Sequence, residues 1–322
     1  MKCKMKIICI LLISLILTAC GNSTSDVSSG SAGNKNSAGT TTHPENIDPS
    51  MLRDNTSVVY QPEASGTNLL TSSVATVDIS NAGEGYIMVK YSGTSPKVKL
   101  QITAPNGTKY TYNLTAGNDY EVFPLLDSGS YTIGVLENAS GNEYFYVLMQ
   151  EINVEITNTF GPFLYPNQYV SFTQNSTCVA KAKELAANCM SDIDVVANIF
   201  EYVVNNIEYD YDLANNVKSG YLPTPDITLS TNKGICLDYS ALMAAMLRSQ
   251  GIPTRLEVGN AGTVYHAWIS TYISDIGWVS GIIYFDGTDW SIMDPTFAAN
   301  NSAKAVKEFI GDGENYSVKY IY

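Results

Sequence analysis

Three side chains in the second half of the chain have types that suit nucleophilic catalysis. Cys236 begins an apolar run typical of a helix, His266 lies within a β-type run, and Asp294 follows a later one. A cysteine thiolate can attack a carbonyl carbon, an imidazole can move the proton, and a carboxylate can orient the imidazole. We therefore predict Cys236, His266 and Asp294 as catalytic residues.

The predicted helix that carries the cysteine starts after Gly234 and ends near Arg248. Gly251 then offers a left-handed cap and Pro253 a stop. Cys236 thus lies at the amino end of the helix, where N–H groups and the helix dipole stabilise a thiolate. A buried, unreactive cysteine at the head of an apolar helix is the alternative interpretation.

Strands after this helix must place the other two groups. The β-type run Val264–Tyr272 contains His266, and Trp278–Phe285 and Trp290–Met293 follow, the last of which leads into Asp294. A strand beside the first helical turn would bring the imidazole to the thiol. Taken singly, the histidine could be a polar residue at a sheet edge, and Asp294 could belong to a turn.

Two helices are expected before the cysteine, Val179–Asn188 and Asp192–Asn206, the second with Ser191 as its N-cap. Cys178 and Cys189 flank the first helix. Eleven residues of continuous helix would separate them by about 16 Å, which is far beyond disulfide reach. We expect two separate thiols, although a chain that folds back after Cys178 would permit pairing.

The order and spacing of these pieces resemble the transglutaminase-like core of the papain-like superfamily over about residues 192–297. The segments that carry the resemblance are Asn206–Asp210, Lys233–Tyr239, Leu247–Arg255, Tyr265–Trp268 and Trp290–Thr296. The resemblance implies an α+β core and acyl transfer through a thioester. The acyl-enzyme would meet an amine, which gives a cross-link, or water, which gives hydrolysis.

In that chemistry Cys236 would attack a carboxamide or peptide carbonyl, with His266 shuttling the proton and Asp294 orienting the imidazole. The Cys236 N–H would form part of the oxyanion hole, and the segment Asn215–Tyr221 is where we expect a second donor. The sequence has no EF-hand pattern, so the calcium dependence of some animal members of the family does not carry over. Neither a metal nor another cofactor is expected.

Other residues that match the family receive structural assignments. Asp238 lies in the first helical turn, where a carboxylate favours the dipole. Trp268 and Trp290 are expected in the cleft wall or the core. Arg248 and Arg255 are expected to anchor helix and strand ends rather than to bind substrate.

Before this core, period-two patterns predict an antiparallel β-sandwich of about seven strands. The predicted strands are Val74–Ile79, Tyr86–Tyr91, Val98–Thr103, Thr108–Leu114, Tyr120–Phe123, Tyr131–Leu136 and Tyr144–Ile156. Pro105-Asn106-Gly107 predicts a hairpin turn. The many tyrosines suit a structural role or a carbohydrate- or peptide-binding face, so this segment is a spacer or a binding module.

The N-terminus has the pattern of an export signal. Lysines precede an apolar run from Ile7 to Leu17 that is too short to span a bilayer, and Leu17-Thr18-Ala19-Cys20-Gly21 resembles the lipobox of bacterial lipoproteins. By that resemblance Cys20 is lipidated after cleavage and anchors the protein to the outer face of the bacterial membrane. An ordinary secretory signal with an incidental cysteine is the alternative.

A tether rich in Ser, Thr, Gly and Asn follows up to about Ser50 and contains His43, one of only two histidines.

The chain has 322 residues and a net charge of −13, which speaks against nucleic acid as a partner. Six cysteines and two histidines, at these spacings, do not suggest a zinc site.

The predicted organisation is therefore a signal peptide (1–19), a lipidated tether (20–54), a β-sandwich (55–157), a connector (158–175) and a transglutaminase-like catalytic domain (176–322). The leading hypothesis is a surface-anchored cysteine acyltransferase or hydrolase acting on extracellular protein or on peptide, cell-wall peptide included. The alternative is a non-catalytic adhesin or scaffold, in which the β domain recognises a partner and the papain-like fold is a binding platform.

Overall fold

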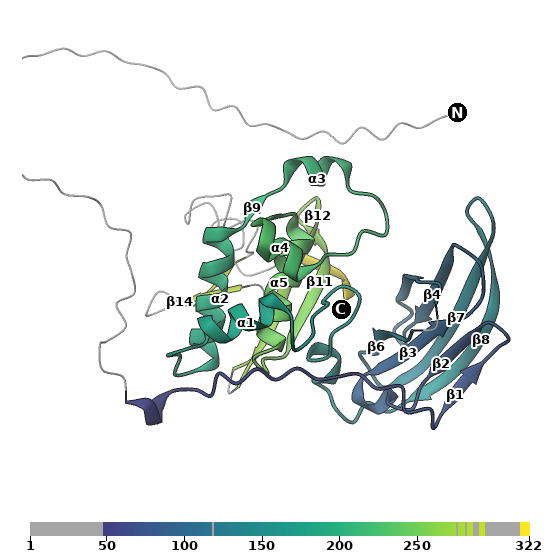
Figure 1. Ribbon diagram of the computed structural model, residues 1–322, viewed down its shortest axis with the longest axis horizontal. Coiled ribbons are helices and arrows are strands. Elements are labelled where there is room, and N and C mark those ends of the chain that lie inside the picture. The colour runs from purple at the N-terminus through teal and green to yellow at the C-terminus, as the bar shows by residue number, and fades with distance from the viewer. Residues whose placement is uncertain (1–47, 118, 275, 281, 286–289, 294–315) are drawn as a thin grey trace, which may run out of the picture. The chain divides into compact units, whose positions relative to one another are not determined.

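The computed structural model describes residues 48–117, 119–274, 276–280, 282–285, 290–293 and 316–322 (Figure 1). The predicted signal peptide, the lipidation site Cys20 and the predicted catalytic Asp294 lie outside the described residues. The described residues belong to one compact unit. No helix within them has both the length and the apolar character needed to cross a membrane.

Two four-stranded antiparallel sheets form the first part of this unit, which confirms the predicted β fold. One sheet has the order β1-β2-β3-β6, with β1 Leu69–Thr71, β2 Ala75–Asp78, β3 Tyr86–Tyr91 and β6 Glu121–Pro124. The other has the order β5-β4-β7-β8, with β4 Val98–Thr103, β5 Lys109–Leu114, β7 Gly129–Ser140 and β8 Glu143–Val154.

Alternation along the strands builds the core of this sandwich. Every second residue of β4 and β5 is buried, as period-two patterning requires. Rings from the two sheets meet inside: Tyr112 and Phe123 have centroids 4.8 Å apart. At the predicted hairpin, Gly107 adopts a φ of +86°, and Thr108 N–H donates to Asn106 Oδ1.

Five helices follow the two sheets, and three of them contact the fifth and most buried one. They are α1 Thr177–Leu185, α2 Asp192–Asn206, α3 Tyr211–Asn216, α4 Pro225–Thr231 and α5 Cys236–Arg248. The N-terminus of α2 has the predicted cap, because Asp194 N–H donates to the Ser191 hydroxyl and Asp194 accepts from Ser191 N–H. The bounds of α2 match the prediction.

A second sheet system packs with these helices. Its main sheet has the order β13-β12-β11-β16, with β11 Thr254–Ala261, β12 Val264–Ile273, β13 Gly277–Ser280 and β16 Tyr316–Ile321. Two short pairs complete it: β14 Ile282–Phe285 with β15 Trp290–Met293, and β9 Glu208–Tyr209 with β10 Lys233–Gly234. Short 3₁₀ turns cover Pro49–Met51, Ala82–Glu84 and Gly161–Phe163.

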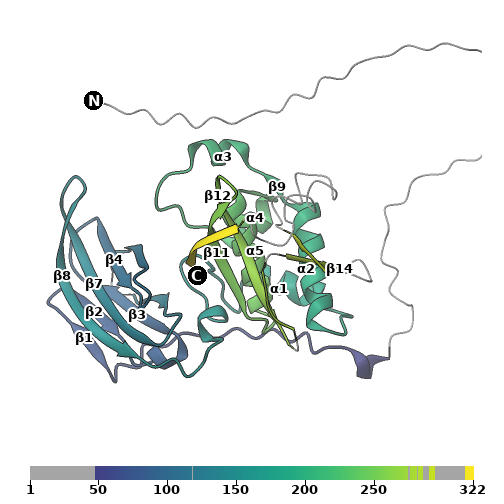
Figure 2. The same ribbon diagram turned by 180° about the vertical axis from the view of Figure 1, so that it is seen from behind.

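Helix α5 is the centre of this α+β layer. All of its residues from Asp238 to Arg248 are buried, as expected for a helix that is enclosed on every side. It contacts α1, α2 and α4 and also β11 and β12. In Figures 1 and 2 the helices lie on one face of the sheet, and α5 has β11 and β12 on one side and other helices on the opposite side.

Some predicted boundaries were wrong, for local reasons. The helix predicted over Val179–Asn188 ends at Leu185, and Asn188 has a left-handed φ of +67°. The strand predicted over Trp278–Phe285 is two strands, β13 and β14, in different sheets. Strand β7 extends well beyond Tyr131–Leu136, because register shifts after Val135 and Asn138 let the β7–β8 hairpin continue.

The first sheets and the α+β layer touch through tyrosines. The Tyr322 ring lies 5.9 Å from that of Tyr110 and 6.1 Å from that of Tyr112, and it stacks on Tyr169 at 4.0 Å.

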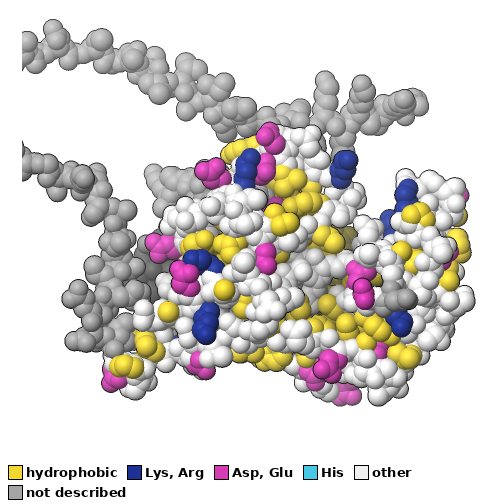
Figure 3. All heavy atoms as spheres, in the orientation of Figure 1, with side chains coloured by type: hydrophobic (Ala, Val, Ile, Leu, Met, Phe, Trp, Pro, Cys, Tyr) yellow, Lys and Arg dark blue, Asp and Glu magenta, His cyan; other side chains and the backbone are white. Residues whose placement is uncertain are grey.

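Figure 3 shows the acidic side chains of one face spread across it instead of gathered in a single patch. Spread charge of this kind is typical of a solvated surface.

Candidate active site

Cys236 is the first residue of α5, and the turn before it is fixed by Asp238. Ile235 N–H donates to Asp238 Oδ2 at 2.8 Å, and the Tyr221 hydroxyl donates to Asp238 Oδ1 at 2.7 Å. Asp238 is buried, and burial raises the pKa of its carboxyl group. The side chain therefore holds the start of α5 and the segment before it together, which is the structural role predicted for it.

Cys236 and His266 line one cavity of about 340 Å³. The thiol comes from the start of α5 and the imidazole from β12, whose residues pack against that helix. Both side chains are half-buried. The structure thus brings together two of the three predicted catalytic residues, and the third, Asp294, lies outside the described residues.

The segment before α4 forms another wall of this cavity. Val217, Lys218, Gly220 and Tyr221 line it. This is the stretch in which a second oxyanion donor is expected. Tyr265, beside His266, lines the cavity as well, and burial raises the pKa of its hydroxyl group.

The other two cysteines of the described residues are free and fully buried. Burial raises the pKa of the Cys178 thiol and raises that of Cys189 to about 11. Asn198 Nδ2 donates to Cys189 Sγ at 3.2 Å. Two separate thiols are present, as predicted, and Cys236 is the partly exposed one among the three.

Strand β12 is held near the cavity by a buried tryptophan. Trp268 is 2% exposed, and its Nε1–H donates to Glu257 Oε2 on β11 at 2.7 Å. Burial raises the pKa of Glu257. The His266 and Trp268 rings are stacked with centroids 6.5 Å apart, so the core position of Trp268 supports the imidazole.

Arg248 anchors the far end of α5, as predicted. It is fully buried, and its guanidinium donates to the main-chain oxygens of Thr254, Tyr165 and Tyr322 at 2.7–2.9 Å. Burial lowers its pKa to about 9. One side chain thus connects the end of the helix to β11, to the connector and to the end of β16.

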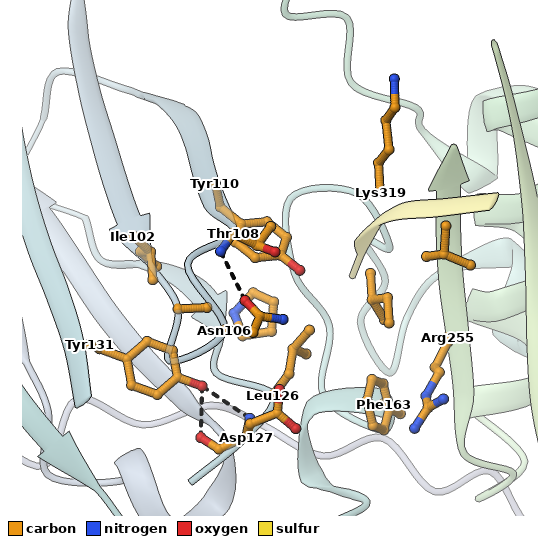
Figure 4. Close-up of a pocket in the computed structure, with 14 residues that line it drawn as sticks. Ile102, Asn106, Thr108, Tyr110, Leu126, Asp127, Tyr131, Phe163, Arg255 and Lys319 are labelled. Atoms are coloured by element: carbon orange, nitrogen blue, oxygen red, sulfur yellow. Dashed lines mark hydrogen bonds between the residues drawn. The ribbon is translucent and has the colours of Figure 1, made fainter. Parts of the chain in front are cut away.

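A second cavity, of about 270 Å³, is lined in part by Arg255 of β11 (Figure 4). No cysteine or histidine is among the described residues that line it. The Arg255 guanidinium lies 3.7 Å from the centroid of Trp278 and 4.8 Å from that of Phe163. Cation–π contacts of this kind fix the side chain. Arg255 is therefore an anchor, in agreement with its predicted role.

The described residues hold no group of three or more His, Cys, Asp or Glu side chains arranged to bind a metal ion. The chemistry that their arrangement offers in the Cys236 cavity is that of a thiol, an imidazole and helix-terminal N–H groups.

Residues 179–281, which include Cys236 and His266, match the family model described as the transglutaminase-like superfamily. The UPF0252 protein MJ1282 of Methanocaldococcus jannaschii is 27% identical over 235 residues, which cover 65% of this chain. The chain spans 64% of the length of that relative.

Two solved structures are similar at low identity. A candidate cysteine protease from Cytophaga hutchinsonii aligns with a TM-score of 0.34 and 17% identity, covering 71% of this chain and 78% of that one. The periplasmic domain of TgpA from Pseudomonas aeruginosa aligns with a TM-score of 0.33 and 14% identity, covering 77% of this chain and all of that one.

The family match falls on α1–α5, β11, β12 and β13, the elements that bring the thiol and the imidazole to one cavity. Residues 179–281 thus match the transglutaminase-like superfamily and form a transglutaminase-like α+β core, and antiparallel β-sheets precede this core in the chain.

Proposed function

We propose that this protein is a cysteine-dependent enzyme that transfers or hydrolyses acyl groups of protein or peptide substrates through a thioester. The observation that carries the proposal is the cavity that Cys236 and His266 share. The transglutaminase-like match over the same residues supports this reaction class. Cys236 is only half-buried and lines that cavity, which supports access of a substrate carbonyl to its sulfur.

In the first half-reaction, Cys236 Sγ attacks the carbonyl carbon of a carboxamide or peptide bond, and the thiol proton passes to His266. The carbonyl oxygen becomes an oxyanion, which the Cys236 N–H at the start of α5 stabilises. The carbon–nitrogen bond then breaks, and the leaving ammonia or amine takes the proton from His266. A thioester remains on Cys236.

In the second half-reaction, a primary amine or a water molecule attacks the thioester and gives its proton to His266. The carbon–sulfur bond breaks, and the proton returns to Cys236 Sγ. An amine yields an isopeptide or amide product, whereas water yields a carboxylic acid. Asp294 is proposed to accept a hydrogen bond from the imidazole and to fix its orientation.

We also propose that the enzyme is exported and anchored through a lipid on Cys20, so that it acts outside the cell membrane. The basic start, the short apolar run and the lipobox-like sequence support this location. Labelling cells with a radioactive fatty acid tests the anchor. Label on the wild-type chain that is absent from a Cys20→Ala variant is expected, and label that persists in the variant would contradict it.

The activity is tested with a glutamine-rich protein and a fluorescent primary amine. Ammonia release with amine incorporation indicates transfer, ammonia release alone indicates deamidation, and a new N-terminus indicates proteolysis. A Cys236→Ala variant should lose all three, whereas Cys178→Ala should keep the activity that the wild type shows. A phenotype of the intact protein that survives Cys236→Ala would instead identify a non-catalytic scaffold.

A further inference from the structure

Another cavity lies on the other side of the segment 217–221 from the Cys236 cavity. Ser219 lines this cavity, which measures about 440 Å³, while its neighbours Lys218 and Gly220 line the Cys236 cavity. Its other walls come from the sandwich. We call it the sandwich groove, and its polar and aromatic lining consists of Lys97, Lys99, Asn113, Asn142, Tyr144 and Ser219.

The segment between the two cavities lies directly against β5. Gly220 has a left-handed φ of +86°, and a Cβ at this position would lie 2.5 Å from Asn113 Nδ2. Gln168 Nε2 also donates to the main-chain oxygen of Asn113 at 2.8 Å. Because two adjacent residues, Ser219 and Gly220, face the two cavities, a peptide bound at Cys236 needs few further residues to reach the sandwich groove.

The charge of the two cavities differs from that of the whole chain. The protein has 31 acidic and 18 basic residues, yet no Asp or Glu is among the described residues that line either cavity. Lys97, Lys99 and Lys218 do line them, and the ion pairs within the described part of the chain do not involve these three. Three cations therefore line the two cavities.

The lysines of the sandwich groove are placed to meet a ligand. The Lys99 ammonium lies 4.6 Å from the centroid of the Tyr144 ring, which restricts its position. Lys97 is exposed beside it, and the Asn113 and Asn142 amides add hydrogen-bond donors and acceptors. Ammonium groups beside amides suit a peptide that carries carboxylates.

We propose that the sandwich groove binds acidic residues of the same peptide whose acyl group is transferred at Cys236. The inference rests on the proposed function, because it names the substrate class of the Cys236 site. It assigns Lys97 and Lys99 to substrate recognition, and it gives the sheets that precede the transglutaminase-like core a part in specificity.

The experiment uses the full chain with Cys236→Ala, so that bound peptide is not consumed. Two fluorescent peptides share a central glutamine and differ in their flanks, which are glutamates in one and serines in the other. Fluorescence anisotropy should show the glutamate peptide binding about threefold to tenfold tighter at low salt. At about 1 M salt, where the Debye length is about 3 Å, the advantage should disappear.

Paired variants locate the effect. Lys97→Gln with Lys99→Gln should abolish the preference for the glutamate peptide, whereas Lys109→Gln, which changes an exposed lysine on β5 that does not line the groove, should keep it. Equal affinity for the two peptides, or a preference that survives the double substitution, would overturn the inference. Turnover by the enzyme with an intact Cys236 is a separate readout: binding as expected without turnover of either peptide counts against the proposed function alone.

Discussion

The Tyr221 hydroxyl donates a hydrogen bond of 2.7 Å to the buried Asp238 carboxylate, and this bond joins the segment that walls the active-site cavity to the helix that begins with Cys236. Asp238 in turn accepts from Ile235 N–H, so the cap of the helix and the wall of the cavity share one side chain. The position of the wall therefore depends on the same group that fixes the start of α5.

Loss of this bond should cost both stability and activity. In Tyr221→Phe, Asp238 Oδ1 loses the Tyr221 hydroxyl, and we expect the free energy of unfolding to fall by about 1–3 kcal/mol. Urea denaturation measures this, and kcat/KM should fall as the cavity wall loosens. Tyr211→Phe on α3, where the tyrosine is exposed, is the matched control and should change neither quantity. Identical results for the two variants would argue against the role assigned to the bond.

Alkylation should distinguish the three described cysteines. At about pH 6, iodoacetamide should modify Cys236 well before Cys178 or Cys189, because Cys236 is half-buried at a helix N-terminus while burial raises the pKa of the other two thiols. Mass spectrometry of proteolytic peptides gives the three rates. In denaturant the rates should converge, and equal slow labelling of the folded protein would contradict an accessible nucleophile.

Replacing Arg248 should destabilise the fold strongly. Arg248→Met leaves three main-chain oxygens, two buried and one partly buried, without the guanidinium, so the free energy of unfolding should fall by about 3 kcal/mol or more. Lys233→Met removes an exposed partner of Asp210 and should cost less than about 1 kcal/mol. Chemical denaturation of both variants tests the comparison, and a loss for Arg248→Met as small as that for Lys233→Met would be inconsistent with an anchor.

Burial of Glu257 should make stability depend on pH. Because its pKa is raised in the folded state, the folded protein binds this proton more readily than the unfolded chain does. The contribution of Glu257 to stability is thus complete at a pH below the usual carboxyl pKa and is lost as pH rises through the folded pKa. Urea unfolding between about pH 4 and pH 7 should show this decline relative to Glu257→Gln. Parallel profiles for the two proteins would refute it.

Substitution of two glycines with the same φ angle should separate the effect of backbone strain from that of a side-chain contact. Gly107 and Gly220 both have a φ of +86°, but a Cβ would meet nothing within 4 Å at Gly107 and would lie 2.5 Å from Asn113 Nδ2 at Gly220. Each Ala substitution should cost about 1 kcal/mol or more of stability through the backbone. Only Gly220→Ala should also weaken binding of the glutamate peptide, and an equal effect at Gly107 would show that the contact is irrelevant.

Local signals in the sequence predicted the elements that those signals control. Ser191 and Asp194 form a reciprocal cap, and the predicted bounds of α2 match the structure. Strands β3 and β4 also match: β4 alternates between buried and half-buried residues, whereas β3 is an almost continuously buried run of β-type residues. The short helix α4 was missed, since Pro225 suggests a break, although proline is well tolerated in a first helical turn.

Contacts between distant segments could not be predicted in this way. Strand β16 pairs with β11 across more than fifty residues, and the Tyr221–Asp238 bond depends on how a loop returns to α5. The order of the family motifs did predict that Cys236 and His266 meet, and the shared cavity agrees with it. The role of Asp294 stays a prediction.

The deep burial of Cys178 and Cys189 has a consequence for survival in an oxidising environment. Neither sulfur reaches the surface, so among the three described cysteines a thiol oxidant or a foreign disulfide meets Cys236 alone. A mixed disulfide would then block the proposed activity reversibly at one position, and a small thiol reductant would restore that activity without reshuffling any other bond among these three residues. Among the described cysteines, the fold thereby concentrates thiol redox sensitivity in the atom that performs the proposed chemistry.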